Sequence, residues 1–137
     1  MSIVHARLLE LSSLGFRHIL EDAIYILSGE GDRISRERGQ FVSRDLWGLL
    51  KEAEIGATVS QSKTLTADAK KIQGLKTYMA LKELTRVKNV RTFEKGLSAT
   101  ERVLGDVCFN TPPPTELRRK ALVFLKDLLE AVKRPRP

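Results

Sequence analysis

The chain has 137 residues, 42% of them hydrophobic and 30% charged, and its formal net charge is +7. This length and apolar content fit one domain with a modest core, so we expect residues 1–137 to form a single helical domain. The N-terminal residues lack the apolar run and cleavage site of a signal peptide, and no stretch reaches the roughly 18 apolar residues of a membrane span. Secretion by a signal peptide and a membrane span are therefore not expected, and the high charged content is typical of thermophilic proteins.

Apolar residues recur at helical spacing through most of the chain, and no proline precedes Pro112. This pattern predicts an all-α fold, a four- to five-helix bundle in which residues 1–28 form an N-terminal helical arm and residues 133–137 a basic tail. The first helical segment covers residues 8–27 and either bends or divides at Gly15. The polar residues 28–32, which include two glycines, end it.

The middle of the chain predicts two more helices separated by a polar linker. We expect a connecting loop at residues 34–39, a helix that begins near the capping residue Ser43 and ends at Gly56, and an exposed linker at residues 57–64. A third, strongly basic helix is expected over residues 66–89.

Two helices are predicted in the C-terminal part. The sequence Ser98-Ala-Thr-Glu101 matches a capping box and predicts a helix start, and the prolines at 112–114 end that helix. Thr115 is expected to cap the last helix, whose amphipathic stripe runs from Leu117 to Val132.

Positive charge is concentrated in one part of the sequence. Residues 63–97 hold nine basic and three acidic side chains, whereas residues 1–62 hold seven basic and nine acidic ones. Basic side chains that lack acidic partners neutralise phosphates, which predicts nucleic acid as a partner. The predicted contacts are this run and the tail, namely Lys63, Lys70, Lys71, Lys76, Lys82, Arg86, Lys88, Arg91, Lys95, Arg134 and Arg136.

Contact with the backbone of duplex DNA is favoured over base stacking onto a single strand, because only Tyr78 and Phe93 are aromatic in the basic segment. Basic side chains also solvate exposed helices, but the segment has few acids to interleave with its lysines. Around residues 33–44, by contrast, arginines alternate with acids, so local ion pairs and phosphate contact both remain open.

The sequence contains no pattern typical of a catalytic or metal site. His5 and His18 are not at helical metal-pair spacing, and Cys108 lies between apolar neighbours and is expected to fill the core. We therefore expect neither an enzyme nor a bound cofactor.

An apolar N-terminal helix, a lysine-rich central helix between Lys63 and Lys95, and a basic tail ending in proline together resemble the major capsid proteins of filamentous archaeal viruses. The resemblance implies a repeating subunit that packages duplex DNA in a helical nucleocapsid. It also implies an oligomer with identical or similar helical subunits, located in the virion or the host cytoplasm. Two alternatives remain open: a small helical RNA-binding subunit of a CRISPR effector complex, and a helical protein–protein adaptor that binds through the stripe from Leu117 to Val132.

Overall fold

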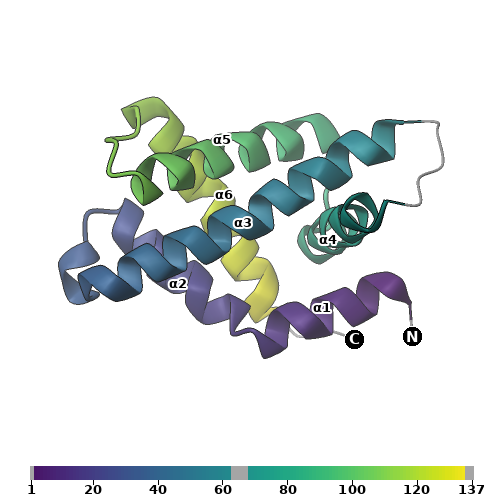
Figure 1. Ribbon diagram of the computed structural model, residues 1–137, viewed down its shortest axis with the longest axis horizontal. Coiled ribbons are helices and arrows are strands. Elements are labelled where there is room, and N and C mark those ends of the chain that lie inside the picture. The colour runs from purple at the N-terminus through teal and green to yellow at the C-terminus, as the bar shows by residue number, and fades with distance from the viewer. Residues whose placement is uncertain (1, 63–67, 135–137) are drawn as a thin grey trace.

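The computed structural model describes residues 2–62 and 68–134, and within these ranges all regular secondary structure is helical, with no strand. The prediction of an all-α bundle is confirmed, although the described residues form six α-helices rather than four or five. The elements are α1 (Ile3–Ser13), α2 (Phe16–Leu27), the short 3-10 turn η1 (Gly31–Arg33), α3 (Arg36–Gln61), α4 (Ala69–Thr85), α5 (Val90–Cys108) and α6 (Thr115–Lys133). The long α3 runs diagonally across the molecule, and α2, α4 and α5 pack against it (Figure 1).

The first helical segment divides at Gly15, one of the two outcomes expected there. Gly15 has φ +75°, a left-handed conformation that glycine adopts without steric cost, and α2 begins directly after it. The two helices pack on the same chain instead of extending from it as an arm, α1 against α4 and α2 against α3 and α6 (Figure 1). Their apolar residues are buried in this way, the most enclosed being Leu11, Phe16, Leu20, Ala23 and Leu27.

Helix α3 is longer at both ends than the sequence pattern predicted. It begins at Arg36 because the hydroxyl of Ser35 accepts a hydrogen bond from the backbone N–H of Arg38, so the expected loop at residues 34–39 is partly helix. Ser43, the expected cap, is fully buried in the helix interior. The helix also continues through Gly56 to Gln61, which corrects the expected end and shortens the linker.

The boundary between α4 and α5 also differs from the prediction. Helix α4 ends at Thr85, and α5 begins after Asn89, whose side chain accepts from the backbone N–H of Thr92. The Ser98–Glu101 motif lies inside α5 and starts no helix, because the buried Phe93 and Leu97 continue the helix's apolar stripe before it.

The last helix begins as expected at residue 115, although its N-cap position is Pro114 and no side chain caps it. Residues of its apolar stripe pack into the central core, where Leu125 and Leu128 are fully buried. This stripe is therefore core and does not supply the exposed binding face that an adaptor needs.

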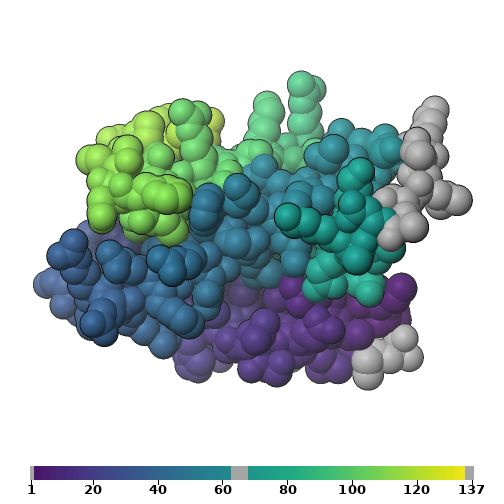
Figure 2. Space-filling view, in the orientation of Figure 1, coloured from purple at the N-terminus to yellow at the C-terminus, as the bar shows by residue number. Residues whose placement is uncertain are grey.

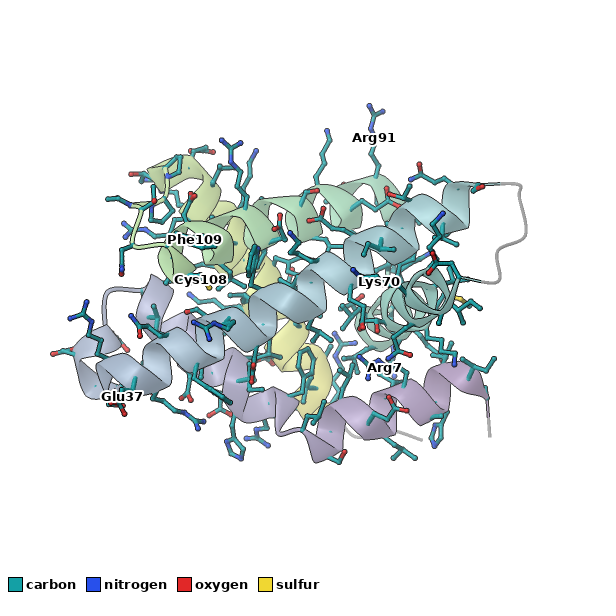
Figure 3. All side chains as sticks on the ribbon, viewed as in Figure 1. Arg7, Glu37, Lys70, Arg91, Cys108 and Phe109 are labelled. Atoms are coloured by element: carbon teal, nitrogen blue, oxygen red, sulfur yellow. The ribbon has the colours of Figure 1, made fainter. Side chains whose placement is uncertain are left out.

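A buried arginine attaches α1 to the rest of the bundle. The guanidinium of Arg7 donates to Thr77 Oγ1 on α4 at 2.9 Å, to Glu52 Oε2 on α3 at 2.8 Å and to Glu10 Oε2 at 2.7 Å. The hydroxyl of Thr77 also donates to Glu52, at 2.6 Å. Only 8% of Arg7 is exposed, and its side chain lies between α1 and α4 (Figure 3). Since each of the three guanidinium nitrogens donates to an acceptor and two of these acceptors are carboxylates, the charge is compensated inside the protein.

Helices α3 and α4 approach most closely where two glycines face each other. A Cβ added to Gly56 would lie 2.0 Å from the carbonyl oxygen of Gly74, and one added to Gly74 would lie 2.7 Å from the carbonyl oxygen of Glu52. Backbone can therefore touch backbone at this crossing only because both positions lack side chains.

We expect Gly56→Ala to lower the free energy of unfolding by about 2–3 kcal/mol, because the new methyl group must push α3 away from α4. Gly48→Ala is the matched control on the same helix, since nothing lies within 4 Å of a Cβ at Gly48. The control should raise stability by about 0.5–1 kcal/mol through helix propensity. Thermal and urea unfolding of both variants measure the difference, and equal effects would contradict the close crossing.

Candidate functional site

A groove of about 990 Å³ lies between α5 and α6 and reaches the short connector that joins α4 to α5. Its floor is apolar. The rings of Phe93 and Phe124 pack with their centroids 5.5 Å apart, and Gly96 makes room for the second ring, because a Cβ there would lie 2.7 Å from Cδ2 of Phe124. Val123 also lines the groove and is 62% exposed, so the groove presents apolar surface to solvent.

Cationic side chains surround this floor. Seven lysines and arginines line the groove against two carboxylates, Asp127 and Glu130. The cations are Arg86, Lys88, Lys95, Arg102, Arg119, Lys120 and Arg134. Within residues 2–62 and 68–134, none of the seven takes part in an ion pair. The groove therefore carries a concentrated positive charge that the described part of the chain leaves largely uncompensated.

The cations reach the groove from three elements at regular helical positions. Lys95 and Arg102 are seven residues apart on α5, a spacing that returns to one helix face. Lys120 lies on α6, and Arg134 directly follows the end of that helix. The connector adds Arg86, which ends α4 with a left-handed backbone at φ 53°. Glycine usually occupies such a position, and another residue there costs about 1–3 kcal/mol.

The groove contains four of the eleven residues predicted from the sequence to contact nucleic acid: Arg86, Lys88, Lys95 and Arg134. Arg91 lies one turn before Lys95 on α5 and extends away from the bundle (Figure 3). Side chains of this helix stand clear of the surface in Figure 2. Lys63 and Arg136 lie outside the described residues.

The other predicted contacts are lysines of α4, which are not part of the groove. Lys70 and Lys71 are exposed in the first turn of α4, where their backbone N–H groups donate to the carboxylate of Asp68. Lys76 is half-buried, and the ammonium of Lys82 lies 4.9 Å from the ring centre of Tyr78. The structure therefore divides the predicted basic ladder into a set on α4 and a set at the groove.

Three groove cations were missed by the sequence analysis: Arg102, Arg119 and Lys120. They belong to residues 98–137, where eight basic side chains accompany five acidic ones and the excess is less conspicuous. The consecutive Arg118, Arg119 and Lys120 at the start of α6 are the sequence pattern that would have indicated this surface.

Glu94, one of the three acidic residues of the basic segment, is hydrogen-bonded to uncharged side chains. Glu94 accepts a hydrogen bond from the hydroxyl of Tyr78 at 2.5 Å and another from the amide of Gln61 at 3.2 Å. Burial and the Glu94 hydrogen bond raise the pKa of Tyr78 to about 12, so the phenol stays protonated and continues to donate. Glu94 thus links α4 and α3 to α5 and forms no ion pair with a described cation.

The arginines around α3 are partly engaged in local contacts. Arg38 forms an ion pair with Asp22 at 2.9 Å, and the guanidinium of Arg33 lies 6.0 Å from the ring centre of Tyr25. These contacts favour the local-pairing interpretation of this region over phosphate contact, although Arg36 and Arg44 remain exposed.

A pair of carboxyl groups, Glu54 and Glu101, lies where α3 meets α5. Burial raises the pKa of Glu54 to about 7, with further contributions from the charge of Glu101 and a hydrogen bond to it, and nearby Lys51 acts in the opposite direction. Glu101 also accepts a hydrogen bond from the indole N–H of Trp47 at 2.6 Å. Carboxyl pairs of this kind can exchange protons in enzymes, but neither carboxyl lines the α5–α6 groove or the smaller hollow of about 360 Å³ between α1, α2 and α3.

The cysteine and the possible metal ligands of the described residues do not form a reactive site. Cys108 is half-buried, and burial raises the pKa of its thiol, which favours the unreactive protonated form. Among the described residues, no group of His, Cys, Asp and Glu side chains is arranged to hold a metal ion. Nor is any described helix both long and apolar enough to cross a membrane.

No protein-family model, no curated protein and no solved structure matches this chain. The case for a function therefore rests on the geometry of the groove and on its charge.

The raised pKa of Glu54 predicts a pH-dependent stability. The folded protein holds a proton at Glu54 that the unfolded chain already releases near pH 4.5, so the Glu54 contribution is fully present below that pH and is lost as pH rises towards about 7. We expect Glu54→Gln to remove this dependence. At about pH 8 the variant should be more stable than the parent by about 1 kcal/mol, a value reduced for screening by water.

Denaturant unfolding between about pH 4 and pH 8 measures this effect. Glu116→Gln, at an exposed position on α6, is the control and should keep the pH profile of the parent. A Glu54→Gln variant with the same slope as the parent would contradict the assignment of the proton to Glu54.

Proposed function

We propose that this protein binds nucleic acid through the phosphate backbone and acts as a structural component, not as an enzyme. The observation that carries the proposal is the α5–α6 groove, in which seven cations from three elements converge against two carboxylates and form no described ion pair. Bringing like charges together in this way opposes folding unless a polyanion occupies the surface. Binding would release the counterions condensed on the nucleic acid, which gives affinity without a requirement for sequence.

The arginines that form ion pairs elsewhere in the protein also support phosphate binding at the groove. Arg7, Arg17 and Arg38 are each paired with carboxylates, whereas the groove cations are not. The buried Arg7 is thus committed to the fold, whereas the groove cations remain available to phosphates.

The more specific role implied by the resemblance is a repeating subunit of a helical nucleocapsid, and it remains part of the proposal. The corresponding RNA-binding role in a CRISPR effector complex would use the same cations, because both ligands present a phosphate backbone. A protein–protein adaptor is supported by a different observation, the 62% exposure of the apolar Val123 beside the groove.

The backbone-binding proposal predicts how affinity depends on salt. We expect simultaneous substitution of Arg102, Arg119 and Lys120 by Gln to weaken the salt dependence. The slope of log affinity against log salt should become less negative by about 2–3, since each lost phosphate contact removes about 0.7–0.9 from its magnitude. Fluorescence anisotropy titrations with labelled oligonucleotides over a range of salt concentrations measure the slope.

The matched control removes the same charge elsewhere. Substitution of Arg33, Arg36 and Arg44 by Gln should leave the slope within error of the parent, because these side chains do not line the groove. A larger change after substitution of Lys70 and Lys71 than after the groove triple would place the phosphate contacts on α4. Affinity that is independent of salt in the parent protein would contradict the proposed function.

The nucleocapsid role predicts assembly. Adding long nucleic acid to the purified protein should produce regular filaments in negative-stain microscopy, because the ligand aligns many subunits along one axis. The groove triple is the control and should form few or none. Particles that remain monomeric with saturating DNA and RNA would remove the nucleocapsid role and leave the adaptor as the better explanation of the groove.

A further inference from the structure

The two walls of the α5–α6 groove differ in charge. The α5 wall presents Lys95 and Arg102, together with the hydroxyls of Thr92 and Ser98, and contributes no carboxylate to the groove lining. The α6 wall is mixed: it also carries cations, but both groove carboxylates, Asp127 and Glu130, lie on it. A ligand that were uniformly anionic along both sides would be attracted by one wall and repelled along part of the other.

A polynucleotide strand has the asymmetry that these walls require. One edge of the strand carries phosphates, and the other carries bases with N–H donors. An ionised carboxylate only accepts hydrogen bonds, and the exocyclic amino group of cytosine is a donor that Asp and Glu side chains recognise. The phosphates therefore suit the α5 wall, and the amino groups of the bases suit Asp127 and Glu130.

The apolar lining of the groove favours one strand over two. In a duplex the base faces are stacked and the base edges are paired, whereas the bases of a single strand can turn towards an apolar surface and present their edges to side chains. A single strand can turn its bases towards Val123, which lines the groove and is 62% exposed. Phe93 and Phe124 are each only 8% exposed, so the floor offers contact with apolar surface more than stacking.

We infer that the α5–α6 groove binds single-stranded nucleic acid, with the phosphates along the α5 wall and the amino-bearing base edges facing Asp127 and Glu130. This inference rests on the proposed function and specifies its ligand. The sequence favoured duplex DNA because it contains few aromatic residues. We replace the duplex by a single strand, because the groove carboxylates and the apolar lining suit bases that are not paired.

The test compares three labelled probes of about 12 nucleotides, within the range bound by single-strand proteins: oligo(dC), oligo(dT) and a mixed-sequence duplex. Anisotropy titrations at neutral pH and fixed salt give their affinities for the full chain. Oligo(dC) should bind about tenfold more tightly than oligo(dT), because only cytosine has an amino group to donate to the carboxylates, and one hydrogen bond to a charged group has about this value. Both single strands should bind more tightly than the duplex.

Removing the groove carboxylates tests the orientation of the strand. In the double variant D127N/E130Q, the preference for oligo(dC) over oligo(dT) should fall towards equality, while both affinities rise because two negative charges are gone. The matched control is E83Q/E116Q, which removes two exposed carboxylates outside the groove. It should raise affinity without changing the preference.

The contact between the bases and Val123 can be tested by a substitution that leaves the charge of the groove unchanged. Val123→Gln should weaken single-strand binding about threefold or more by adding a polar group where bases approach, without changing the charge of the groove. Val90→Gln is the control, because Val90 is also exposed on a helix but does not line the groove. Equal effects of the two variants would exclude contact between the bases and the floor.

The outcomes separate this inference from the function on which it rests. Duplex binding as tight as single-strand binding, or an oligo(dC) preference that persists in D127N/E130Q, would overturn the inference and leave backbone binding in place. Failure of all three probes to bind at low salt would overturn the proposed function itself.

Discussion

The contact on which the bundle depends is the crossing of α3 and α4 at Gly56 and Gly74, where no Cβ separates the two backbones. A close crossing brings the flanking turns into reach of each other. Glu52, one turn before Gly56, and Thr77, just after Gly74, therefore meet around the guanidinium of Arg7 and secure α1 to both helices. With α4 held against α3 and α1 held against α4, the other side of α3 receives α5, and α6 completes the groove (Figure 1).

Much of the fold could be predicted from local sequence, because helical periodicity is a local property. The division at Gly15 and the apolar stripe of α6 were read from single segments, and both agree with the structure. Helix boundaries were less predictable where distant contacts decide them. Glu101 looked like half of a capping box, but it accepts a hydrogen bond from Trp47, 54 residues earlier in the chain. Likewise, Gly56 looked like a helix end until its partner across the crossing was known.

The candidate site could be predicted only in part, for a similar reason. Counting charges along the chain found Arg86, Lys88 and Lys95, which are close in sequence. It did not find Arg102 or Arg119, because the excess of positive charge in their segment is smaller, and the packing of α6 on α5 brings them beside the others. The apolar lining of the groove could not be predicted from the sequence either. Helix α6 carries a clear buried stripe, and its solvent-facing side is therefore not expected to line a groove.

The position of Trp47 gives the molecule a built-in optical reporter. It is the only tryptophan in the chain, and its indole touches the carboxyl pair on the side of α5 that faces α3, with the ring of Phe109 edge-on at 5.7 Å. The groove lies on the opposite side of the same helix. Tryptophan emission thus arises from a single environment with α5 between it and the groove. Occupation of the groove would reach this fluorophore through α5, and proton uptake at Glu54 would reach it through Glu101, the hydrogen-bond partner of the indole. A ligand and a proton could then be observed in one spectrum without an attached dye.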